Sequence, residues 1–116
     1  MVLSFGPNGI SGHYDHITVG VQAKKIAKKI GARFYAVTLP PKVAKNALAY
    51  LRTRRSAGHY ASDISFQKPS IRVSIDPKVK KRAIRAHLSQ MDSKNSFTGF
   101  PDFAVRELLK AEYFIG

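Results

Sequence analysis

The chain has 116 residues, of which 20 are Lys or Arg and 7 are Asp or Glu, so its net charge is +13, and it has no cysteine. This length suits one small domain with a modest core, and the cysteine count excludes disulfides and thiolate metal sites. No apolar run approaches the ~20 residues that span a bilayer, and no basic region followed by an apolar stretch marks a secretory signal. A cytoplasmic protein that favours polyanionic partners is therefore expected.

The N-terminal third predicts a strand, a glycine loop, a helix and a second strand. Residues 1–5 are apolar and lead into a glycine-rich stretch, which is typical of a strand that enters a loop. Asp15 is placed to cap a helix that ends at Gly31. The apolar stripe of this helix is expected to consist of Val19, Ala23, Ile26 and Ile30. Residues 33–39 are a nearly continuous apolar run, which favours a strand buried on both faces of a parallel sheet.

The rest of the chain predicts three more helices and one more strand. Pro41 fits the first turn of a second helix, whose buried face is expected to hold Val43, Ala47, Leu48 and Leu51. Residues 71–75 alternate and indicate a half-covered strand, and Asp76 then caps a third helix. A last helix is expected from 101 to about 113. This alternation favours an α/β fold with parallel strand pairing.

A cluster of potential ligands lies where the glycine loop meets the first helix: His13, Asp15 and His16. Neutral imidazole is a good zinc ligand, and a catalytic zinc keeps three protein ligands and one open position for water. A second histidine can donate to a developing oxyanion, and a neighbouring aspartate can fix its tautomer. The cluster therefore predicts a hydrolytic metal site. The alternative is a capped helix start with two surface histidines.

The stretch from Phe5 to Gly20 resembles the second signature of the PIG-L / LmbE-like zinc-dependent N-deacetylase family. That signature runs glycine, histidine, usually proline, aspartate, histidine and then a helix, and it is matched by Gly12, His13, Asp15 and His16, with Tyr14 in place of the proline. Two later blocks are similar to the family's late pattern and ending: Lys81, Ala83, Ala86-His87 and Ser89-Gln90, and then Glu112-Tyr113-Phe114. The resemblance covers residues 2–116.

The resemblance implies a partial Rossmann-like α/β layer with parallel strands flanked by helices, in which residues 1–116 are the C-terminal segment. The family's first signature, an alanine-histidine-proline-aspartate-aspartate-glutamate run, is absent; it supplies a His and an Asp to the zinc and an Asp as general base. The implied reaction is removal of the acetyl group from an N-acetylglucosamine-type amide of a sugar conjugate. We expect this chain to be inactive unless a complementing N-terminal chain or a homo-oligomer completes the site.

By resemblance, His16 is the zinc ligand. His13 stabilises the oxyanion of the tetrahedral intermediate or protonates the leaving amine, and Asp15 orients and charges His13. His87 is implied to line the substrate site. Because His87 lies on the apolar side of its helix, the alternative is a hydrogen-bonded core histidine.

Two other functions stay open. The charge of +13 fits a basic module that binds nucleic acid or acidic lipid, and any such binding is expected to be nonspecific. The alternative is a basic surface that has no polyanionic partner. Against a dedicated module, the Lys and Arg residues are spread over three predicted helices, and no known nucleic-acid-binding motif occurs. The third interpretation is a gene remnant without activity.

Overall fold

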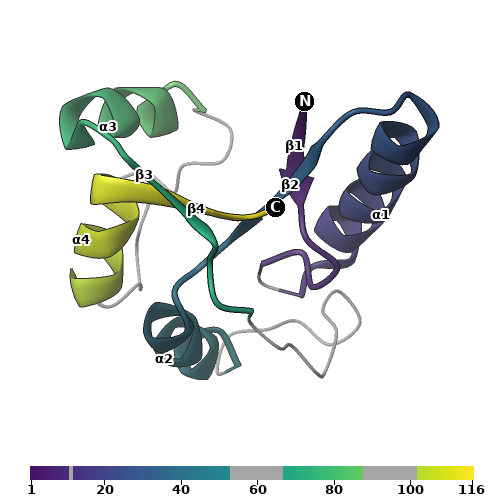
Figure 1. Ribbon diagram of the computed structural model, residues 1–116. Helices are drawn as coiled ribbons and strands as arrows, with labels where there is room; N and C mark the ends of the chain where they lie inside the picture. Colours follow the sequence, from purple (N-terminus) through teal and green to yellow (C-terminus); the bar gives the residue numbers. More distant parts are fainter. Residues whose placement is uncertain (11, 53–66, 88–101) are drawn as a thin grey trace.

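The computed structural model describes residues 1–10, 12–52, 67–87 and 102–116 (Figure 1). In chain order, the elements of this part are β1 (Val2–Phe5), α1 (Tyr14–Lys29), β2 (Phe34–Thr38), α2 (Pro41–Arg52), β3 (Ile71–Ser74), α3 (Pro77–Arg85), α4 (Asp102–Lys110) and β4 (Ala111–Ile115). The strands form one sheet of order β1-β2-β4-β3. β1 and β2 pair in parallel, whereas β4 pairs antiparallel with both β2 and β3. The mixed α/β class is confirmed, but parallel pairing is wrong for both pairs that involve β4.

The start of α1 differs from the prediction in its cap. His13 is the N-cap, with extended backbone, and its Nδ1 accepts from the Asp15 N–H at 3.2 Å. Asp15 instead lies in the first turn of the helix, where a carboxylate suits the positive end of the helix dipole. The prediction of Asp15 as the cap is wrong because His13 already satisfies a free N–H group of the first turn.

α1 packs on the sheet through its small residues. Gly20 and Ala27 are buried, whereas Val19, Ile26 and Ile30 are 52%, 56% and 65% exposed. A Cβ at Gly20 would collide with the carbonyl oxygen of the last β1 residue, so the helix backbone lies directly against the strand. The predicted stripe is therefore wrong for its three bulky members, because such a close approach selects the smallest side chains; its fourth member, Ala23, is half-buried.

The last helix ends at Lys110 and the chain continues directly as β4. The prediction of a helix to about residue 113 is therefore wrong. Within β4, Tyr113 is buried, and Phe114 lies opposite Val37 of β2 and Ile71 of β3. Pairing on both sides with these strands outweighs the local helical pattern, because strand formation depends on cross-strand neighbours.

The β3–α3 segment is the least covered part of the described chain. Asp76 caps α3 as predicted, its Oδ1 accepting from the Lys78 N–H at 2.8 Å. The predicted strand is confirmed as β3, but all four of its residues are exposed, so the prediction that it is half-covered is wrong. The side of α3 that carries His87 is exposed as well, so the alternative of a core histidine is wrong; its exposed members are Val79, Ala83, Ala86 and His87.

The buried apolar core of the described residues is small and consists of Ala27, Ala36, Val43, Ala44, Leu109, Ala111 and Tyr113. Val43 is the predicted inward residue of α2 that is confirmed; the side chains of Ala47, Leu48 and Leu51 lie outside the described ones. Figure 1 shows α1 at one end of the sheet and α3 and α4 at the other. Among the described helices, none has the length and apolar character that crossing a bilayer requires.

Candidate metal centre

The loop between β1 and α1 is a hydrogen-bonded turn. The Gly9 N–H donates to the Gly6 carbonyl at 3.0 Å, and the Gly12 N–H donates to the Asn8 carbonyl at 2.9 Å. The Asn8 side-chain oxygen also accepts from the Ile10 N–H at 3.1 Å. Ile10 has a φ of 65°, which is strained for a β-branched residue. Backbone strain of this kind is concentrated at functional sites.

His16 is held between this loop and β1. Its Nδ1 lies 3.2 Å from the Gly9 carbonyl oxygen. Its ring stacks on Phe5, with 4.2 Å between ring centroids and an interplanar angle of 6°. Gly9, with a φ of 58°, permits this approach, since a Cβ there would lie 2.9 Å from the His16 Cβ. The imidazole is therefore fixed on one edge by a hydrogen bond and on one face by an aromatic ring.

The hydrogen bond determines the tautomer of His16. Because a carbonyl oxygen can only accept, Nδ1 carries the hydrogen, and in the neutral ring Nε2 therefore has the lone pair. Metal-ligating histidines almost always donate their other N–H to a carbonyl, a carboxylate or water, which fixes both the tautomer and the ring orientation. His16 thus already makes, through Nδ1, the kind of hydrogen bond that metal-ligating histidines make with their second ring nitrogen.

His13 has the opposite arrangement. Its Nδ1 accepts the Asp15 N–H, so in the neutral ring the hydrogen is on Nε2. The rings of His13 and His16 have centroids 5.2 Å apart and are tilted by 38°. In the neutral rings, the lone pair is therefore on Nε2 of His16, and the hydrogen is on Nε2 of His13.

Asp15 lies beside His13, but its carboxylate contributes little to the position of the ring. Its Oδ2 is 3.8 Å from the His13 Nδ1, and its side chain is 86% exposed. Exposed ion pairs of this kind are worth about 0–1 kcal/mol. Of these two contacts with Asp15, the backbone N–H at 3.2 Å orients the His13 ring more than the carboxylate at 3.8 Å does.

The cluster does not make a metal site by itself. Within residues 1–10, 12–52, 67–87 and 102–116, no group of three or more His, Cys, Asp or Glu side chains could hold a metal ion. His87 is exposed after α3, and Figure 1 shows α3 and the β1–α1 loop on different sides of the molecule. The structure therefore does not bring His87 to the cluster, and its motif partners Ser89-Gln90 lie outside the described residues.

Three residues of the site were not predicted: Phe5, Gly9 and Gly20. Gly20 carries a signal that sequence reasoning could have used, since it is four positions after His16 and hence on the same helix face. Phe5 and Gly9 carry none, because their contact with His16 depends on how the loop closes. Phe5 also lines a mostly apolar cavity of about 330 Å³ between α1 and the sheet.

Comparison of the chain with models of protein families, with curated proteins and with solved structures finds no match. The interpretation of the cluster therefore depends on its sequence pattern and its geometry.

Proposed function

We propose that this chain is the C-terminal part of a metal-dependent hydrolase that removes an acetyl group from an N-acetylglucosamine-type amide. The proposal joins the resemblance to the PIG-L / LmbE-like deacetylases, with their Rossmann-like layer, to one structural observation. That observation is the opposite hydrogen bonding of His16, whose Nδ1 faces the Gly9 carbonyl, and His13, whose Nδ1 accepts a backbone N–H.

In this proposal the residues have separate roles. His16 would hold zinc through Nε2, and the remaining ligands and the general base would come from outside this chain. Bound zinc polarises a carbonyl and lowers the pKa of its water. His13, through its Nε2–H, donates to the amide oxygen as negative charge develops there, or gives a proton to the leaving amine. Phe5 and Gly9 keep the His16 ring in position.

The first experiment measures zinc binding to the chain as it is, by competition with a chromophoric chelator. We expect weak binding, because one histidine ligand and one neighbouring donor do not complete a zinc shell. His16→Ala should remove this binding. His87→Ala is the matched control, an exposed histidine on another element, and should leave binding unchanged.

An amine-release assay on N-acetylglucosamine conjugates accompanies the titration. The unaccompanied chain should release no amine. Stoichiometric zinc with turnover would show that the chain needs no further ligands, and equal loss of zinc in the two histidine variants would show that the ion binds nonspecifically. Either result would contradict the proposed division of ligands.

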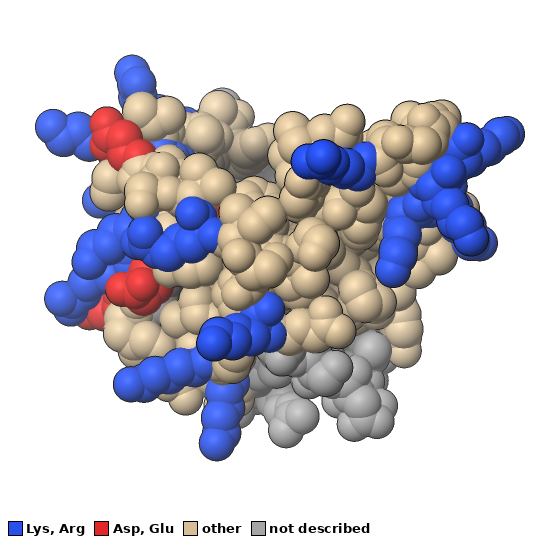
Figure 2. Space-filling model, viewed as in Figure 1, with Lys and Arg blue, Asp and Glu red and all other residues tan. Residues whose placement is uncertain are grey.

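A second candidate function, nucleic-acid binding, is favoured by α3. This helix contains no acidic residue, and four of its basic side chains are exposed: Lys78, Lys81, Arg82 and Arg85. Figure 2 shows Lys and Arg side chains mostly toward the two sides of the molecule. If this function holds, duplex DNA binding should fall steeply with salt, and charge reversal of these four residues should abolish it while His16→Ala should not.

A further inference from the structure

The outer surface of α1 carries a row of aliphatic side chains that does not pack on the sheet. Val19, Ile26 and Ile30 share one helix face by their spacing and are 52%, 56% and 65% exposed. The helix packs through Gly20 and Ala27 instead, which are buried. The exposed row is about 16 Å long. Single exposed aliphatic residues are ordinary on a surface, whereas an aligned row of this kind marks an interaction site.

This apolar stripe, as we call Val19, Ile26 and Ile30, is bordered by cations. Two exposed lysines directly precede its isoleucines, and two more form the next row around the helix: Lys25 and Lys29, and Lys24 and Lys28. The acidic residue of α1 is Asp15 in the first turn, about 13 Å along the axis from the nearest of these lysines. Figure 2 shows blue side chains gathered at the end of the molecule where α1 lies. The surface of α1 is therefore both apolar and strongly basic.

The combination of charge and apolar character selects the partner. A nucleic acid would pair with the lysines and leave the isoleucines in water, and an uncharged apolar partner would leave the lysines unused. A folded acidic protein usually needs a contact of about 20–30 residues, whereas this surface consists of three aliphatic side chains and four lysines. A bilayer with anionic headgroups satisfies both kinds of side chain, because its acyl chains begin just below the phosphates and lysine stems are long enough to keep the ammonium groups at that level.

We propose that α1 binds the surface of an anionic phospholipid membrane. The apolar stripe enters the boundary between headgroups and acyl chains, and the lysines lie on headgroup phosphates. The helix has 16 residues, fewer than the roughly 20 that span a bilayer, so it lies on the membrane rather than across it. Because few side chains enter the membrane, binding is reversible. The inference requires neither zinc nor deacetylation and goes beyond the proposed function.

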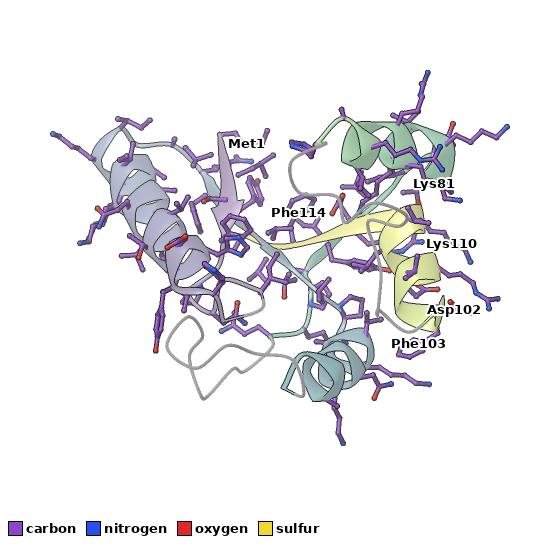
Figure 3. The ribbon with its side chains drawn as sticks, turned by 180° about the vertical axis from the view of Figure 1, so that it is seen from behind. Met1, Lys81, Asp102, Phe103, Lys110 and Phe114 are labelled. Carbon is purple, nitrogen blue, oxygen red and sulfur yellow. The ribbon has the colours of Figure 1, made fainter. Side chains whose placement is uncertain are left out.

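Co-sedimentation with lipid vesicles tests the charge. The chain should bind vesicles that contain phosphatidylserine much more tightly than vesicles of phosphatidylcholine alone, and salt should weaken the binding. Lys25→Gln with Lys29→Gln should weaken it at least about tenfold, since each lysine near an anionic surface contributes about fivefold. Lys78→Gln with Lys81→Gln is the matched control on α3, where both lysines are exposed. Figure 3 shows Lys81 at the opposite end of the molecule from α1, so this pair should matter far less.

The apolar stripe is tested without a change of charge. Ile26→Ser should weaken vesicle binding about fivefold, because the membrane then covers one aliphatic side chain fewer. Val79→Ser is the matched control, since Val79 is 48% exposed on α3, and it should leave vesicle binding unchanged. Neither substitution should affect binding of the chain to duplex DNA.

A fluorescent label reports whether the apolar stripe enters the lipid. The chain has no cysteine, so Val19→Cys and Val79→Cys each provide a single labelling site. Lipids with brominated acyl chains should quench a label at position 19 and not one at position 79. The proposal is overturned by equal binding to the two kinds of vesicle, by control variants that weaken binding as much as the α1 variants do, or by quenching at neither position or at both. DNA binding that Ile26→Ser weakens as much as vesicle binding would assign the stripe to a nucleic acid and overturn it too.

Discussion

Histidines stand at two helix ends of the described chain, and they are held in different ways. At the start of α1, His13 caps the helix, and His16 is fixed by the Gly9 carbonyl and by the Phe5 ring. After α3, His87 is exposed, and its backbone N–H donates to the Ile84 carbonyl at 3.1 Å. The side chains of His13 and His16 are thus held by neighbouring residues, whereas the contact described for His87 is a backbone hydrogen bond that extends the last turn of α3.

The difference comes from the chain that precedes each histidine. The β1–α1 loop turns back on itself through left-handed residues, so that the end of β1 and the middle of the loop both reach the first turn of α1. α3 follows an exposed strand, and most of its residues face solvent. Of the two sequence blocks, the first thus forms an organised cluster, whereas the described part of the second ends in the exposed side chain of His87.

The strongest test of this contrast is His13→Ala in a chimera that supplies an N-terminal half with the missing histidine-aspartate signature. The metal should stay bound, because His16 is unchanged, and turnover should fall by about 10²–10³, the usual effect of losing one oxyanion donor. Steady-state kinetics and metal analysis measure the two effects. His87→Ala should change turnover far less.

His13→Asn separates catalysis from helix capping. Asparagine is a good N-cap, so this variant should keep the stability that His13→Ala loses, about 1 kcal/mol, and still lose turnover. If His13→Ala released the metal while His16→Ala retained it, the roles of the two histidines would be reversed.

The sequence predicts the local elements around the two helix ends, but not the contact that fixes His16. β1, β2 and the end of α1 follow from local apolar runs and glycines, and Asp76 caps α3 as its chemistry indicates. The proximity of His13 and His16 follows from helical spacing. The stack on Phe5 does not, because it requires the loop to close.

Two errors have a common physical origin in contacts between distant segments. The insertion of β4 between β2 and β3 is a nonlocal pairing, and the local pattern of residues 111–115 resembles the end of a helix as much as a strand. The predicted buried face of α1 is wrong because the apolar pattern favours Val19 and Ile26 over Gly20 as buried residues. Contact with the β1 backbone instead requires Gly20 on the buried face, since no larger side chain fits there.

Gly20→Ala should destabilise the chain by about 1–3 kcal/mol, the usual effect of overpacking. The added methyl group meets the backbone of the last β1 residue, which cannot rotate away as a side chain could. Chemical denaturation measures the change. Val79→Ala on α3 is the comparison: Val79 is 48% exposed, and the expected change is within about 0.5 kcal/mol. Equal effects at the two sites would mean that α1 is no more tightly packed than α3.

Phe5→Leu should have a smaller effect that is specific to the metal. It keeps most of the apolar volume but removes the stack on His16, which is worth about 0.5–1.5 kcal/mol. Zinc affinity should fall by that amount, as measured by chelator competition. Phe103→Leu on α4, where the ring is 39% exposed, should leave zinc affinity unchanged. A similar decrease in zinc affinity in the two variants would show that Phe5 does not position His16.

The smallest effect is expected for Asp15→Asn. The substitution keeps the backbone N–H that donates to the His13 Nδ1, and it removes a carboxylate whose side chain is 86% exposed. The loss consists of a weak ion pair, about 0–1 kcal/mol, and a favourable charge at the positive end of α1, about 0.3–1 kcal/mol. Turnover in the chimera should therefore decrease less than about tenfold. Asp76→Asn, which neutralises the corresponding end of α3 while keeping a good cap, should destabilise the chain equally little and leave turnover alone. A hundredfold loss for Asp15→Asn would show that the carboxylate, and not the backbone N–H beside it, prepares His13 for catalysis.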